Sequence, residues 1–276
     1  MQEYQINIKT KKMISQRKIL LITRHGECPK APDGVNSLDE LLPESFSESY
    51  KTGAFLRNFV DQENVTPLDT FLKHSGKKRT KYTGEAILTG AFGMKTEPTK
   101  PEDLEPYRQR LASQGLDTEQ LPMLDFEDIK FSINGFKRDG ENGYISKWIA
   151  NPMATQYDNG EEITSFQECL EIRSECLAKI LEQFLKGNKK LGVIASHCCS
   201  IDAIVVGALN SGRVTPIRST KEYGQSFKQG DFATILLDPT DQGYKTTLVR
   251  NGQPYETNLH NMLKYPGKST LDLPPK

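Results

Sequence analysis

The sequence predicts an α/β fold of three layers, in which a central, mostly parallel β-sheet is flanked by helices and carries an inserted cap region. Short apolar runs alternate along the chain with segments of helical periodicity, a pattern typical of strands joined by helices. Apolar runs also end abruptly in polar loops, as buried strands do. The 276 residues show no internal repeat and are enough to bury one large core.

We divide the chain into a charged leader at 1–17, one domain at 18–250 and a tail at 251–276. Within the domain, residues 96–151 have a weak pattern and begin with a Pro-rich stretch. We expect this cap region to be an insertion that contributes to a lid over the functional site.

The first expected strand is Lys18–Thr23, an apolar run that stops at Arg24-His25-Gly26. The last two expected strands flank the turn "PTDQG" and predict a hairpin. The strands expected after the first are 68–75, 190–198, 232–238 and 245–251.

Helices are expected where apolar residues recur at helical spacing. The clearest is 160–186, which ends at Gly187-Asn188. The other expected helices are 43–60, a segment beginning at Lys78, a short helix within 96–115, and a buried helix at 202–210.

The composition gives no sign of a nucleic-acid or membrane partner. The 36 basic residues balance 36 acidic ones, so an anionic ligand would have to be held by local cations. The longest apolar stretches are too short to span a membrane, and the N-terminus lacks the apolar core of a signal peptide. The five cysteines have no disulfide-framework spacing. We therefore expect a cytoplasmic protein with reduced cysteines.

Two basic motifs follow expected strands. Arg24 and His25 follow the first strand, and His197 lies at the end of the strand expected at 190–198. Ligands of open α/β sheets bind outside the carboxyl ends of the strands, so these side chains can face one crevice that Arg79 can also reach. Guanidinium groups bind phosphate, and a neutral imidazole can attack a phosphoryl group.

Three stretches carry a family resemblance: "ITRHGE" (Ile22–Glu27), "SGKKRTKYTGEAI" (Ser75–Ile87) and "VIASHCCSIDAIVVGAL" (Val193–Leu209). In this order and strand context, the chain resembles the histidine phosphatase superfamily, in its phosphoglycerate-mutase-like branch. The helices expected at 43–60 and 160–186 also look like helices of that family.

The resemblance implies a role for each matching residue. His25 would be the phosphorylated nucleophile, Arg24 and Arg79 would bind the phosphoryl oxygens, and His197 would donate a further hydrogen bond to the same group. A carboxyl group would protonate the leaving oxygen and then activate water. In "LPMLDFEDIKFSING", Glu127 has the usual residue type and Asp128 the better spacing, and we rank them equally. Glu105 follows behind them.

The implied function is metal-independent hydrolysis of phosphomonoesters, without a cofactor, on a small phosphorylated substrate or a phosphopeptide. Two alternatives stay open: a phosphoglycerate mutase, and a module that binds phosphorylated ligands without turnover. The sequence departs from the family at Cys28, where Thr or Ser is common, and at Cys198-Cys199 after the second histidine. It also lacks an asparagine that many members place shortly after the nucleophile. The substrate and the oligomeric state are not predicted.

Overall fold

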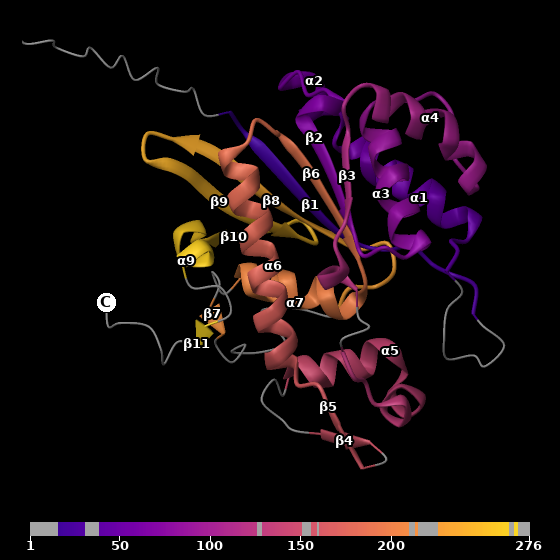
Figure 1. The fold of residues 1–276 in the computed structure, drawn as a ribbon, viewed down its shortest axis with the longest axis vertical. Helices are drawn as coiled ribbons and strands as arrows, with labels where there is room; N and C mark the ends of the chain where they lie inside the picture. The colour runs from indigo at the N-terminus through magenta and orange to yellow at the C-terminus, as the bar shows by residue number, and fades with distance from the viewer. Residues whose placement is uncertain are drawn as a thin grey trace, which may run out of the picture.

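The computed structural model describes residues 16–30, 39–125, 129–150, 156–158, 160–209, 213–214, 226–264 and 268–269 (Figure 1). Within them, one sheet of seven strands forms the centre of the molecule. In spatial order the strands are β10 (Gln253–Thr257), β9 (Gly243–Arg250), β8 (Phe232–Thr240), β1 (Lys18–Arg24), β6 (Leu191–Ser196), β2 (Thr70–His74) and β3 (Asp117–Gln120).

The central strands are parallel, as the sequence predicts. β1 pairs in parallel with β6, β6 with β2, and β2 with β3. The hairpin of β8 and β9 forms as expected, and β8 pairs antiparallel with β1. β10 then adds an antiparallel edge strand beyond Arg250, so the sheet extends into the segment expected to be a tail.

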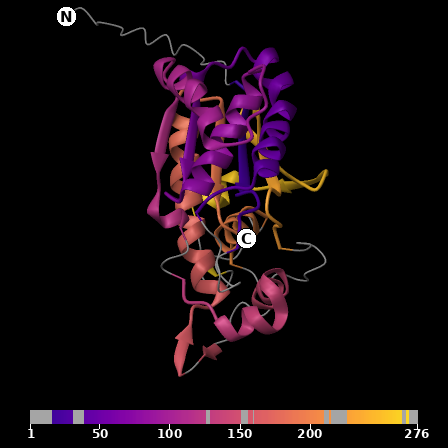
Figure 2. The same ribbon diagram turned by 90° about the vertical axis from the view of Figure 1, so that its right-hand side faces the viewer.

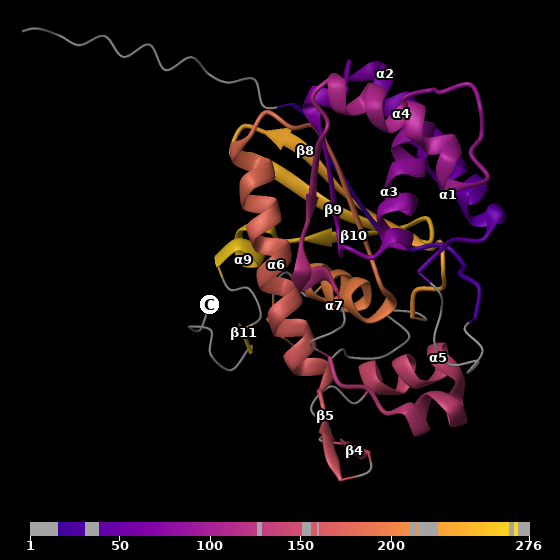
Figure 3. The same ribbon diagram turned by 45° about the vertical axis from the view of Figure 1, so that its right-hand side comes forward.

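The helices lie on both faces of the sheet (Figures 1 and 3). The helices α1, α2, α3 and α4 follow β1 and β2, whereas α6, α7 and α9 come from the second half of the chain. The helices are α1 (Pro43–Phe55), α2 (Arg57–Gln62), α3 (Lys78–Ala91), α4 (Pro101–Ser113), α5 (Ile133–Ala150), α6 (Phe166–Lys186), α7 (Cys198–Leu209) and α9 (Leu259–Lys264). The shorter elements are η1 (Pro67–Asp69), η2 (Pro122–Leu124), β4 (Gln156–Asp158), β5 (Glu161–Ile163), β7 (Arg213–Val214) and β11 (Lys268–Ser269).

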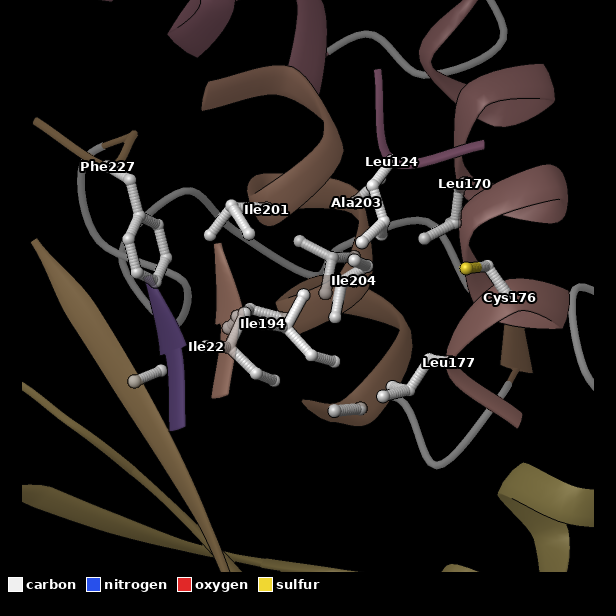
Figure 4. Close-up of a cluster of buried hydrophobic side chains, with 14 of the residues drawn as sticks. Ile22, Leu124, Leu170, Cys176, Leu177, Ile194, Ile201, Ala203, Ile204 and Phe227 are labelled. Atoms are coloured by element: carbon white, nitrogen blue, oxygen red, sulfur yellow. The ribbon is translucent and has the colours of Figure 1, made fainter. Parts of the chain in front are cut away.

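The side chains of β1 show how the two faces form. Leu20 and Ile22 pack in the core under α6 and α7, whereas Ile19 and Leu21 pack in the core with residues of α2, α3 and α4. Alternate side chains of a strand point to opposite faces, and here both faces are covered. Figure 4 shows Ile22 and Ile194 meeting the side chains of α7 and α6.

Local signals explain where the helices begin. Ser165 and Glu168 form the capping box that starts α6, in which the Ser165 hydroxyl accepts from the N–H of Glu168 at 3.2 Å. Pro43 and Pro101 occupy the first positions of α1 and α4. α7 begins at Cys198 rather than at Asp202, directly after the second histidine.

The predicted cap region divides between two places. α4 lies beside α3, and β3 joins the main sheet as an edge strand. α5, which bends at Gly140, lies beyond the end of the sheet at which β1 finishes, and so does the hairpin of β4 and β5, which follows the predicted cap region (Figures 1 and 2). Part of the expected insertion is therefore sheet rather than cap.

Candidate active site

Three adjacent parallel strands deliver the candidate residues to one edge of the sheet. β6 lies between β1 and β2, and all three run in the same direction. Their carboxyl ends are followed by His25, by His197 and by Ser75. This edge is where open α/β sheets bind ligands.

His25 is held as a neutral imidazole. Its ring is buried, and its Nδ1 lies 2.7 Å from the carbonyl oxygen of Gly26. A carbonyl only accepts, so Nδ1 carries the proton and Nε2 carries a lone pair. Burial, with the positive charges of Arg24 and Arg79, holds the pKa of His25 well below 6.5. At neutral pH the ring can act as a nucleophile through Nε2.

His197 stands edge-on to His25, with 5.1 Å between the ring centroids and 68° between the planes. Its Nε2 lies 2.9 Å from the hydroxyl of Ser75, which lies 3.0 Å from the hydroxyl of Thr80. Thr80 donates its only proton to the carbonyl of Lys77, so Ser75 donates to Thr80 and accepts from His197. The chain of hydroxyls therefore places the His197 proton on Nε2. Burial lowers the pKa of His197 well below 6.5, and His25 and Arg79 add to this.

The two predicted phosphate-binding arginines are buried beside His25, where their charges act on its pKa. Arg24 ends β1, and its Nη1 donates to the carbonyl of Phe227 at 2.7 Å. Arg79 lies in the first turn of α3. The structure thus brings together the four residues that the sequence predicts at this edge of the sheet: Arg24, His25, Arg79 and His197.

A buried carboxylate orients the segment that holds Arg24. Asp202 of α7 is fully buried and accepts from the hydroxyl of Ser226 at 2.7 Å and from the N–H of Phe227 at 3.1 Å. Phe227 presents its carbonyl to Arg24. Sequence analysis did not single out Asp202, although an acidic residue within an otherwise apolar helix is a signal that it has buried partners.

Gly26 has a packing reason for being glycine. A Cβ on it would lie 2.5 Å from the Cβ of Ser45 in α1. Its N–H donates to the hydroxyl of Thr83 at 3.2 Å, and Thr83 donates to the carbonyl of Arg79 at 2.8 Å. This contact ties the loop after β1 to the helix that carries Arg79.

Among the described residues, the sequence reasoning missed a carboxyl group that lies close to His197. Oδ1 of Asp125 lies 3.6 Å from Nε2 of His197, and its Oδ2 lies 3.7 Å from Nζ of Lys77. Asp125 is buried. It lies in the same stretch as Glu127 and Asp128, and residue type alone does not distinguish the three.

The structure does not place the other carboxyl candidates beside the histidines. Glu127 and Asp128 lie outside the described residues. Glu105 is on α4, where its half-exposed side chain forms an ion pair with Arg108, one turn along the same helix. Arg108 also binds both oxygens of Glu85, so Glu105 belongs to a surface ion-pair network.

Cys28, at the position where the sequence departs from the family pattern, packs against the site. Its Sγ lies 3.6 Å from Nδ1 of His25 and 3.5 Å from the carbonyl oxygen of Gly26. Burial raises the pKa of the Cys28 thiol to about 11, so it stays protonated at neutral pH. We interpret it as a small packing residue.

Within the described residues, no group of three or more His, Cys, Asp or Glu side chains is arranged to hold a metal ion. No described helix combines the length and the apolar composition needed to cross a lipid bilayer.

Comparison with solved structures decides the fold. A structure titled mycobacterial hydrolase 1 matches with a TM-score of 0.51 at 11% identity, covering 85% of this chain and 97% of that chain. The chain has the histidine phosphatase fold. At this identity the likeness shows the fold alone. The three-layer fold predicted from the sequence is thereby confirmed.

Two further structures with the histidine phosphatase fold match over most of their lengths. A mycobacterial glucosyl-3-phosphoglycerate phosphatase is 12% identical with a TM-score of 0.48, covering 88% of this chain and 100% of that chain. A phosphoglycerate mutase from Bacillus anthracis str. Sterne is 14% identical with a TM-score of 0.48, covering 90% of this chain and 95% of that chain. A scan against protein-family models found no match. A search of curated proteins found none either.

Proposed function

We propose that this protein hydrolyses phosphomonoesters through a phosphohistidine on His25. The observation that carries the proposal is the state of His25: a buried, neutral ring with its proton on Nδ1, set between two arginines. Two guanidinium groups can hold a phosphoryl group while Nε2 attacks it. In this proposal the positive charge at the site comes from Arg24 and Arg79, without a metal ion.

In the first step, the Nε2 lone pair of His25 forms a bond to phosphorus. The ester P–O bond breaks, and its electron pair goes to the leaving oxygen. A protonated carboxyl group supplies the proton that makes this oxygen an alcohol. We assign that group to Asp125, because its buried carboxyl lies beside His197 at the same sheet edge. Arg24 and Arg79 would stabilise the charge on the phosphoryl oxygens.

In the second step, water attacks the phosphohistidine. The Asp125 carboxylate takes a proton from the water, the P–N bond breaks, and the electron pair returns to Nε2 of His25. Inorganic phosphate leaves, and His25 and Asp125 regain their starting protonation states. One carboxyl group thus serves as acid and then as base.

The test is hydrolysis of p-nitrophenyl phosphate by the wild type and by His25→Ala, with a chelator present. Activity in the wild type alone, with acid-labile phosphate trapped on the protein by a rapid quench, is the expected result. Full activity in His25→Ala would rule the mechanism out. Loss of wild-type activity on adding the chelator would rule out the metal-independent form.

The two alternative functions, a phosphoglycerate mutase and a non-catalytic binding module, are tested with the same protein preparation. Conversion of 3-phosphoglycerate in the presence of a bisphosphoglycerate primer would favour a mutase. Binding of vanadate or phosphate by a wild type that turns over no phosphomonoester would favour a binding module. The proposed substrate remains a small phosphorylated molecule or a phosphopeptide.

A further inference from the structure

A buried arginine outside the phosphate site holds the backbone of Asp125. Arg173 lies on α6, and its side chain is fully buried. Burying a guanidinium group is costly unless it is hydrogen-bonded. Its Nη2 donates to the carbonyl oxygen of Asp125 at 2.5 Å, and its Nε donates to the hydroxyl of Ser200 at 3.1 Å.

Two serines complete this contact. The hydroxyl of Ser200, in the first turn of α7, donates to the same Asp125 carbonyl at 3.3 Å. The hydroxyl of Ser196, at the end of β6, donates to the carbonyl of Leu124. The carbonyls of two consecutive residues are thus held by donors from α6, β6 and α7, next to His197.

The position of these donors matters because the proposed function requires Asp125 to transfer a proton to the leaving oxygen. A carboxyl group that transfers a proton must stay within hydrogen-bond reach of the reacting oxygen. A short aspartate side chain has little reach of its own, so its backbone must be placed accurately. A misplacement of about 1 Å at a reacting group can cost on the order of 10²-fold in rate.

We propose that Arg173 is a positioning residue for the general acid: it fixes the backbone of Asp125 so that the carboxyl group reaches the leaving oxygen. This inference rests on the proposed function and deepens it. In this proposal Arg173 acts through Asp125, to whose carbonyl oxygen it donates. A purely structural role would lower stability, but it would not select among leaving groups.

The leaving group gives the decisive readout. A nitrophenolate departs without a proton, whereas an alkoxide needs one from the acid. We therefore expect Arg173→Lys and Arg173→Met to lower kcat/KM for an alkyl phosphate on the order of 10²-fold more than for p-nitrophenyl phosphate. Ser174→Ala, on the same helix and also buried, is the matched control and should leave the ratio of the two rates unchanged.

A double-mutant cycle with Asp125 tests the same idea independently. Once Asp125→Asn has removed the acid, adding Arg173→Lys should cost little more, because the two residues act as one unit. Fully additive losses, or equal losses for all leaving groups, would overturn the role of Arg173.

A variant that does not fold and a failure of the proposed function must be distinguished from a failure of the Arg173 proposal. If Arg173→Met does not fold, the Ser196→Ala, Ser200→Ala double variant takes its place, and the same preference for good leaving groups is expected. If the wild type hydrolyses no phosphomonoester, or His25→Ala keeps full activity, the proposed function fails, and the role of Arg173 in proton transfer fails with it. Hydrolysis that depends on His25, with no leaving-group effect in the Arg173 variants, refutes the positioning role alone.

Discussion

At the residue scale, the protonation of His25 decides when the site can react. Its ring is neutral in the fold because burial and two neighbouring cations disfavour the imidazolium. The Gly26 carbonyl then fixes the proton on Nδ1. Charge state and tautomer are both set before a substrate arrives, which is a form of preorganisation.

This state gives a prediction for titration. The ring of His25 should remain neutral as the pH falls from about 8 to about 6, because its folded pKa lies well below the ordinary value. NMR of histidine-labelled protein measures this, with His25→Ala identifying the signal. A midpoint at or above pH 6.5 would contradict the electrostatic description of the site.

Asp125 gives the second prediction. Asp125→Asn should lower kcat/KM for an alkyl phosphate by about 10²–10⁴-fold, because general acid catalysis contributes that much. Glu105→Gln is the control and should have little effect, since Glu105 belongs to the ion-pair network of Arg108. Measuring Glu127→Gln and Asp128→Asn in parallel decides among the carboxyl candidates. Full activity in Asp125→Asn would return the assignment to Glu127 or Asp128.

At the element scale, the position of Arg79 depends on how closely α1 and α3 approach. Two glycines allow this contact: Gly53 of α1 faces the backbone of Ile87, and Gly90 of α3 faces the backbone of Tyr50. A Cβ at either position would overlap a carbonyl oxygen that cannot move aside. The helix that carries Arg79 is therefore fixed against α1 by backbone contact.

We predict that Gly90→Ala lowers the free energy of unfolding by about 3 kcal/mol, measured by urea denaturation, through overpacking between these helices. Gly143→Ala in α5 is the matched control: its Cβ would lie 3.6 Å from that of Asp139, an ordinary contact. It should be neutral or slightly stabilising. Equal effects of the two substitutions would show that α1 and α3 do not meet as described.

At the scale of the whole molecule, three buried histidines couple stability to pH. The pKa values of His25 and His197 are well below 6.5, and burial lowers that of His74 to about 4. Nδ1 of His74 accepts from the N–H of Gly76 in the turn before α3, which requires a neutral ring. All three histidines regain an ordinary pKa when the chain unfolds.

The sign follows from linkage. Below about pH 6.5 these histidines bind protons in the unfolded chain but stay neutral in the folded chain. Their contribution to the free energy of unfolding is therefore fully present above that pH, and it decreases as the pH falls toward about 4. We expect the urea midpoint to decrease steadily from about pH 7 to about pH 5, and His74→Gln to flatten part of this slope. A midpoint independent of pH in this range would contradict the prediction.

The sequence by itself determined the strands β1, β2, β6, β8 and β9, the main helices between them, and the four residues expected at the sheet edge. Arg24 ends β1, and His25 and His197 directly follow strands. Arg79 lies in the first turn of a helix, so local pattern and parallel pairing suffice to place the four together. The β8–β9 hairpin was likewise readable from its turn.

Only the tertiary structure showed that the Asp125 carboxyl group lies beside His197 and what holds its backbone there. The backbone of Leu124 and Asp125 is held by donors from α6, β6 and α7, far along the chain. The same is true of Asp202 and Phe227, which orient Arg24. Local sequence determines which residues follow a strand. The position of a loop carboxylate depends instead on the packing of distant elements, and short-range periodicity does not predict that packing.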